Sequence, residues 1–268
     1  MGTDGANVND EARSRRVHLF GMDIDVVRET DVIEQLESWI AAPFEAVHYV
    51  VTPNVQHTMV FQENAAFREA YSRAGLVIAD GLPLVLSSRL FGTPLPERVA
   101  GSDLLPLLFD RTSPARSPSV FLLGAAPGVG ERAAALVAER WPHVKVVGTY
   151  SPPFGFERDD AENQRILDLV QKAAPDVLVV GLGAPKQELW TYRFRDQIRA
   201  KVALCIGGSI DFLAGTKARA PRWMRRVGLE WIHRAATEPK RLGPRYAEHA
   251  VLFPMLVLRE WRAAGRRP

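Results

Sequence analysis

The chain has 268 residues, of which 47% are hydrophobic and 24% charged, and its formal net charge is +3. This composition is typical of a globular protein with a sizeable core and excludes wholesale disorder. Cys205 is the single cysteine, so the chain forms no internal disulfide, which fits a cytoplasmic protein. The longest apolar run near the carboxyl end, residues 251–258, is far shorter than the roughly 20 residues that span a bilayer, so any membrane contact should be peripheral.

The charge is distributed unevenly along the chain. Residues from 217 onward carry 13 Lys or Arg and 4 Asp or Glu, a net charge of +9, whereas the preceding residues carry a net charge of −6. The pattern predicts three parts: a disordered lead-in (1–16) without the apolar segment of a signal peptide, an α/β domain that carries the chemistry (17–216), and a basic helical appendage (217–268).

The predicted elements alternate between strand and helix. Residues 17–19 and 22–24 alternate around Phe20-Gly21 and predict a short hairpin. Apolar runs then predict strands at 46–51, 76–79, 119–123, 144–147, 177–180 and 202–206. Helical patterns lie at 31–41, 64–74, 101–111, 129–140, 159–173 and 185–199, and in the appendage at 222–237 and 239–258. The whole predicts a doubly wound, mainly parallel, Rossmann-like sheet.

Short polar residues, Gly and Pro follow every predicted strand of the sheet. Ligands of parallel α/β sheets bind at the carboxyl ends of the strands, where glycine lets the backbone approach a phosphate. Gly124, Gly183, Gly207 and Gly208 are therefore candidate substrate-binding positions, although Gly and Pro also punctuate ordinary loops. The glycine spacing matches neither G-x-G-x-x-G nor a P-loop, so a dinucleotide is weakly supported and a P-loop nucleotidase is disfavoured.

An ordered series of motifs resembles the WecG/TagA/CpsF family of glycosyltransferases (glycosyltransferase family 26). The motifs are TPN (52–54), ADG (79–81), ERVAGSD (97–103), GAPKQE (183–188), GGSIDFLAG (207–215), RAPRWM (219–224), GLEW (228–231) and EPKR (238–241). The resemblance implies inverting transfer of a hexose, N-acetylhexosamine or hexuronic acid from a UDP-sugar. The implied acceptor is a sugar linked to undecaprenyl diphosphate, and the implied pathways build teichoic acid-like and other cell-envelope polysaccharides or exopolysaccharides in bacteria.

Two residues are candidates for the chemistry. Inverting transfer needs a base for the acceptor hydroxyl and a group that offsets charge on the leaving diphosphate. Asp80 follows a buried strand and matches the carboxylate that serves as base in the family; the alternative is a helix N-cap. Arg98 can bind phosphate oxygens through paired donors; the alternative is a solvated surface charge.

Four polar residues are candidate substrate contacts. Thr52 and Asn54 offer contacts to sugar or phosphate, Gln187 offers an amide to sugar hydroxyls, and Asp211 could accept from ribose or uracil. Loop or helix capping is the alternative, particularly for Asn54 and for Asp211.

The sequence favours metal-independent transfer with no cofactor other than the donor substrate. Asp23-Ile24-Asp25 has the D-x-D form of a metal site, but it lies in the hairpin, where alternation should place both carboxylates on one solvated face. The six histidines are scattered without the spacing of metal ligands.

The appendage interleaves basic and apolar residues, a pattern suited to an anionic membrane surface at the inner face of the cytoplasmic membrane. Its Arg234, Arg241 and Arg245 match arginines that complete the active site in the family. Alternatives are a helix face packed on the body and, more weakly, a nucleic-acid surface. An NAD-dependent oxidoreductase or a non-enzymatic nucleotide-binding or nucleic-acid-binding regulator remain the alternative functions, and a homo-oligomer is left open.

Overall fold

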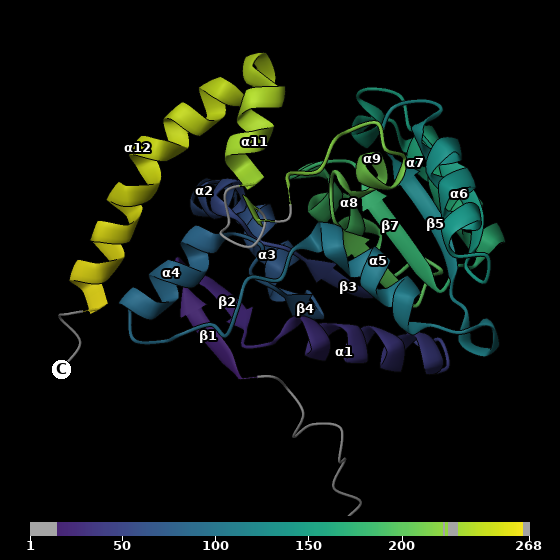
Figure 1. The fold of residues 1–268 in the computed structure, drawn as a ribbon, viewed down its shortest axis with the longest axis horizontal. Helices are drawn as coiled ribbons and strands as arrows, with labels where there is room; N and C mark the ends of the chain where they lie inside the picture. Colours follow the sequence, from purple (N-terminus) through teal and green to yellow (C-terminus); the bar gives the residue numbers. More distant parts are fainter. Residues whose placement is uncertain (1–14, 222, 225–229, 265–268) are drawn as a thin grey trace, which may run out of the picture.

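The computed structural model describes residues 15–221, 223–224 and 230–264 (Figure 1). Most of the predicted lead-in, residues 1–14, lies outside the described residues, and β1 begins at Arg16. No helix in the described part of the chain is both long enough and apolar enough to span a membrane.

The predicted hairpin is confirmed. Strands β1 (Arg16–Leu19) and β2 (Met22–Asp25) pair in antiparallel register through a turn at Phe20 and Gly21. Both turn residues have positive φ, 54° and 84°, as expected when a two-residue turn follows the natural twist of the strands. The hairpin buries Leu19, Met22 and Ile24 in the core on one face of the main sheet.

The main sheet confirms the predicted fold class. It consists of β3 (His48–Val51), β4 (Leu76–Val77), β5 (Ser119–Gly124), β6 (Lys145–Tyr150), β7 (Val177–Gly181) and β8 (Val202–Cys205). Their order is β4-β3-β8-β7-β5-β6 and every neighbouring pair is parallel. The central strands β7 and β8 are buried along both faces, which explains their unbroken apolar sequences.

Helices cover both faces of the sheet. The core on one face contains residues of α2 (Val55–Glu63), α3 (Ala65–Ser72), α4 (Leu82–Leu90), α7 (Asp160–Ala173) and α8 (Lys186–Phe194). The core on the other contains residues of α1 (Glu29–Ala41), α5 (Gly101–Arg111), α6 (Val129–Arg140) and α9 (Ser209–Leu213). Single turns of 3₁₀-helix lie at Pro114–Arg116 and Phe156–Arg158.

Helix α2 was not predicted, and α4 was anticipated only as a helix that Asp80 might cap. The buried residues of α2 include His57 and Thr58, and those of α4 include Ser87 and Ser88. Because polar side chains stand at buried positions, the apolar repeat that marks an amphipathic helix is interrupted.

The appendage packs on the body through its second helix. Helix α11 (Glu230–Thr237) is followed by α12 (Pro239–Ala264), which extends six residues beyond the predicted end. In Figure 1, α12 runs beside α4 and the hairpin. The ring of Phe253 lies 5.4 Å from that of Phe20, and Arg259 donates a 2.9 Å hydrogen bond to Gln62 of α2. Part of the appendage is thus a helix face packed on the body, as the alternative interpretation expected.

Candidate active site

The loops after β3 and β4 are tied together at the carboxyl edge of the sheet. The backbone N–H of Asp80 donates to the carbonyl of Pro53 at 2.9 Å, and that of Val99 donates to the carbonyl of Ala79, also at 2.9 Å. These bonds hold Asp80 and Arg98 side by side. Nη1 of Arg98 donates to Oδ1 of Asp80 at 3.2 Å.

Arg98 also faces a second carboxylate, which comes from the appendage. Its Nη1 lies 3.8 Å from Oε2 of Glu230, the first residue of α11. The three side chains are 25% (Asp80), 16% (Arg98) and 13% (Glu230) exposed, so the cluster is largely shielded but open to a ligand. Glu230 was not among the predicted site residues, although it belongs to the GLEW motif, because the prominent signal of the appendage is its basic residues.

The alternatives for Asp80 and Arg98 are both wrong. The N-cap residue of α4 is Gly81, one position after Asp80. Arg98 is not a solvated surface charge, since it is mostly buried between two carboxylates. The helix instead begins with an apolar turn, which leaves the carboxylate of Asp80 to face Arg98.

Thr52 and Asn54 shape the loop after β3. Thr52 is buried, and its hydroxyl donates a long 3.4 Å bond to the carbonyl of Cys205 at the end of β8. Asn54 caps α2, because its side-chain oxygen accepts from the N–H groups of Gln56 and His57 at 3.0 and 3.3 Å. The capping alternative for Asn54 is confirmed, while contact of either residue with a substrate stays a prediction.

Gln187 braces the loops after β7 and β8. It is 2% exposed, and its Oε1 accepts from the backbone N–H groups of Gly183 and Gly207, each at 3.1 Å. Its Nε2 donates to Glu188 at 2.7 Å. The side chain therefore positions two glycine loops, and direct contact between its amide and a sugar stays a prediction.

The ends of β5 and β7 lie side by side, and from them the chain continues to helices on opposite faces of the sheet. Gly124 ends β5 with a φ of +115°, and a Cβ there would lie 2.5 Å from the carbonyl group of Gly181 at the end of β7. The helices that follow, α6 and α8, pack in the cores on opposite faces. Such a switch point opens a crevice for ligands in doubly wound sheets. Gly208 is the N-cap of α9 on the same edge.

Asp211 lies inside α9 and does not cap it, since Gly208 occupies the N-cap position. Its Oδ2 is 3.7 Å from Nζ of Lys217, which is also 3.7 Å from Oε1 of Glu238, just before α12. Lys217, the first residue of the appendage, therefore links Asp211 of the body to Glu238 beside this edge of the sheet. Contact of Asp211 with ribose or uracil stays a prediction.

Both carboxylates of the D-x-D pair were predicted to lie on one solvated face, and this is wrong for Asp25. Asp23 is exposed, but Asp25 is buried. Asp25 accepts from Arg16 at 2.8 Å and from the backbone N–H of Val77 at 2.8 Å. Because β4 is an edge strand, its amide has no strand partner on that side, and the last residue of the hairpin bonds it instead. Among the described residues, no group of three or more His, Cys, Asp or Glu side chains is placed to hold a metal ion.

Arg234, Arg241 and Arg245 lie on α11 and α12, but their side chains are outside the described part of the structure. Their predicted role at the active site stays a prediction. The two helices contact each other through Trp231 and Tyr246, whose ring centroids are 5.8 Å apart.

A buried titratable pair that the sequence analysis missed lies behind Gln187. Nε2 of His57 is 3.9 Å from Oε1 of Glu188, and its Nδ1 is 2.7 Å from the hydroxyl of Tyr71. Burial lowers the pKa of His57 to about 4 and raises the pKa of Glu188 to about 7. Both groups are therefore neutral at moderately acidic pH. Histidine and glutamate 131 residues apart in sequence carry no local signal of this contact.

Comparison with known proteins identifies the family. Two similar relatives are the N-acetylglucosaminyldiphosphoundecaprenol N-acetyl-beta-D-mannosaminyltransferases of Staphylococcus aureus strains MRSA252 and NCTC 8325, which are 29% and 28% identical. Each alignment covers 236 residues, 88% of this chain and 90% of the relative. The family model described as "Glycosyl transferase WecG/TagA/CpsF family" matches residues 17–267. The doubly wound sheet, the motif loops at its carboxyl edge and this nearly complete match agree: the chain belongs to the WecG/TagA/CpsF family of glycosyltransferases.

Proposed function

We propose that the protein transfers a hexose, N-acetylhexosamine or hexuronic acid, with inversion, from a UDP-sugar to a sugar linked to undecaprenyl diphosphate. The printed names of the relatives specify a diphosphoundecaprenol acceptor. The observation that carries the proposal is the contact between Asp80 and Arg98, a carboxylate and a guanidinium held together at the edge where such sheets bind ligands.

In this proposal Asp80 and Arg98 have separate roles in a single-displacement reaction. The acceptor oxygen forms a bond to the anomeric carbon while the bond between that carbon and the diphosphate breaks. Asp80 takes the proton of the acceptor hydroxyl, and Arg98 offsets the negative charge that develops on the departing UDP. Because a guanidinium already stands at this position, we propose that the transfer needs no metal ion to stabilise the leaving group.

The glycine loops supply the site for the nucleotide. Gln187 fixes the N–H groups of Gly183 and Gly207, so the two loops keep their shape before the donor arrives. Loops of fixed shape at the carboxyl ends of parallel strands suit a nucleotide donor, and its diphosphate would use donors other than these two N–H groups, which already donate to Gln187. We place the donor along these loops and assign Asp211 to the ribose or uracil.

Nucleotide selectivity tests the donor. We expect calorimetric titration to show binding of UDP that is unchanged by Mg²⁺, and weaker binding of ADP and NAD. Tight binding of NAD would favour an oxidoreductase, and binding of none of the three would contradict a nucleotide-sugar donor.

The variant Asp80→Asn tests the base. General base catalysis contributes about 10²- to 10⁴-fold, so turnover should fall by that factor while the circular dichroism spectrum stays unchanged. Asp23→Asn is the matched control, since it makes the same change at an exposed hairpin position. A fully active Asp80→Asn variant would remove Asp80 from the mechanism.

We also propose that the appendage docks on the anionic inner face of the cytoplasmic membrane, where a lipid-linked acceptor would be found. In support, Trp231 and Ile232 of α11 and Val251 and Met255 of α12 are exposed apolar residues in a basic segment. Sedimentation with phosphatidylglycerol vesicles should exceed that with phosphatidylcholine vesicles and should fall with added salt. Equal binding to both would exclude the electrostatic component.

A further inference from the structure

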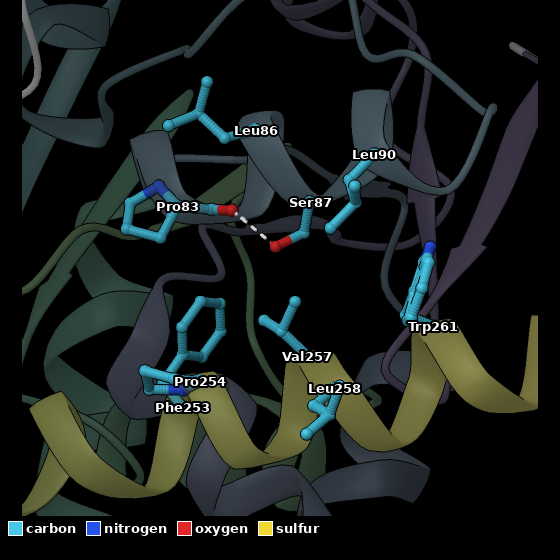
Figure 2. Close-up of a pocket in the computed structure, with 9 residues that line it drawn as sticks. All are labelled: Pro83, Leu86, Ser87, Leu90, Phe253, Pro254, Val257, Leu258 and Trp261. Atoms are coloured by element: carbon cyan, nitrogen blue, oxygen red, sulfur yellow. Dashed lines mark hydrogen bonds between the residues drawn. The ribbon is translucent and has the colours of Figure 1, made fainter.

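Helices α4 and α12 enclose an apolar groove of about 430 Å³ (Figure 2). Leu90 of α4 stands opposite Val257, Leu258 and Trp261 of α12, and Leu86 lines the groove at its edge (Figure 2). Ser87 is polar, but its hydroxyl donates to the carbonyl of Pro83 at 2.8 Å within its own helix. The walls therefore present hydrocarbon to whatever occupies the groove.

The groove is exposed to an unusual degree for apolar surface. The exposed fractions are 51% for Leu86, 57% for Leu90 and 52% for Trp261. These residues belong to two different helices and form one concave surface, unlike isolated apolar residues on a protein surface. A contiguous patch of this kind marks a binding site for an apolar partner.

The α4 wall of the groove begins close to Asp80 along the chain. Pro83, at one end of the α4 wall, is the third residue after Asp80, and the wall from there to Leu90 is about 10 Å long. A molecule that fills the groove up to Pro83 would therefore end only three residues from Asp80 along the chain.

We propose that the groove binds the isoprenoid chain of the acceptor, at the isoprene units nearest the diphosphate. This inference rests on the proposed function. Such an acceptor has three parts in a fixed order, a sugar, an anionic diphosphate and a hydrocarbon chain. The structure offers Asp80 for the sugar hydroxyl and, three residues further on at Pro83, the beginning of an apolar groove for the chain. The carboxyl-terminal segment, with a net charge of +9, supplies basic residues for the diphosphate.

Non-specific contact with a bilayer and binding of an isoprenoid chain in the groove would depend on different residues. Met255 and Val251 of α12 are each 62% exposed, yet they do not line the groove. A bilayer surface would use these residues as readily as Leu86 and Leu90. An isoprenoid chain in the groove would depend on the two leucines but not on Val251 or Met255.

The experiment measures transfer to N-acetylglucosaminyl diphosphates that carry one, two or three isoprene units, in buffer without vesicles. For the wild type, we expect KM to fall at least about fivefold with each added unit that enters the groove. The double variant Leu86→Asn, Leu90→Asn should lose this dependence while keeping kcat and the KM of the shortest acceptor. The matched control Val251→Asn, Met255→Gln should behave as the wild type.

Three results would overturn the proposal. The first is a wild-type KM that is independent of chain length. The second is an equal loss in the control variant, which would indicate a general apolar surface. The third is a change in the sedimentation coefficient of the leucine variant, which would indicate that a second copy of the chain covers the groove.

A photolabel separates this proposal from the proposed function. Geranyl diphosphate with a diazirine on the terminal isoprene should label peptides that contain residues 83–90 or 253–261, and unlabelled farnesyl diphosphate should compete. Labelling there without transfer to any acceptor would leave the groove as an isoprenoid site and refute the transferase reaction. Transfer with labelling elsewhere would refute the groove alone.

Discussion

Replacing Glu188 by Gln should change how the stability of the protein depends on pH. In the native state Glu188 keeps its proton up to about pH 7, whereas an exposed glutamate loses it near 4.5. His57 remains neutral down to about pH 4, whereas an exposed histidine gains a proton below 6.5. Stability rises with pH wherever the unfolded chain binds more protons than the native one, and falls in the opposite case.

In the wild type, Glu188 and His57 have opposite effects on how the free energy of unfolding changes with pH. As pH rises from 4.5 to 6.5, the native pair holds one proton, on Glu188, and the unfolded pair also holds one, on His57. Their combined contribution to the free energy of unfolding is therefore nearly flat across this range. The Glu188 contribution alone falls with rising pH and is lost at about pH 7, and the His57 contribution alone rises up to about pH 6.5.

The variant Glu188→Gln exposes the contribution of His57. Its free energy of unfolding should rise by about 3 kcal/mol from pH 4 to 6.5, at about 1.4 kcal/mol per pH unit. Relative to the wild type, the variant should gain about 3 kcal/mol between pH 4.5 and 7, because over that range Glu188 of the wild type is ionised in the unfolded chain but still protonated in the native state.

Urea unfolding followed by tryptophan fluorescence from pH 4.5 to 8 measures both curves. Glu139→Gln, at an exposed position of α6, is the matched control and should run parallel to the wild type. Parallel curves for Glu188→Gln and the wild type would show that Glu188 does not hold a proton in the native state, and the reasoning from burial would fail.

Three further substitutions test local features by the urea concentration at half-unfolding. Gly124→Ala should cost about 3 kcal/mol or more, because its Cβ would meet the backbone of Gly181, whereas Gly92→Ala should cost only about 1 to 2 kcal/mol, since it has positive φ but open space; equal costs would contradict the close approach. Asp25→Ala should cost about 3 kcal/mol, because it leaves a buried amide of β4 without its partner; a neutral effect would mean that water replaces the carboxylate. Asn54→Ala should cost about 1 kcal/mol through loss of the α2 cap, and Asn54→Asp, which keeps an acceptor, should cost less.

The fold class followed from local patterns because burial leaves a repeat in the sequence. Strands such as Val177–Gly181 are apolar at every position, and a parallel sheet covered on both faces is the structure that buries them. Helices with polar residues at buried positions, such as His57 in α2, broke the repeat and were missed. Asp25 was misplaced for a related reason, since alternation describes a strand but not the neighbour that its last residue meets.

The sequence by itself determined the parallel α/β architecture and the family, because these are encoded in local patterns and in motifs that follow one another along the chain, and it singled out Asp80 and Arg98 as candidates. Only the tertiary structure decided what those residues contact. The strand order, the approach of Glu230 to Arg98 and the groove between α4 and α12 bring together segments that are distant along the chain. Such contacts depend on how whole elements pack, and the local spacing of residue types carries no information about them.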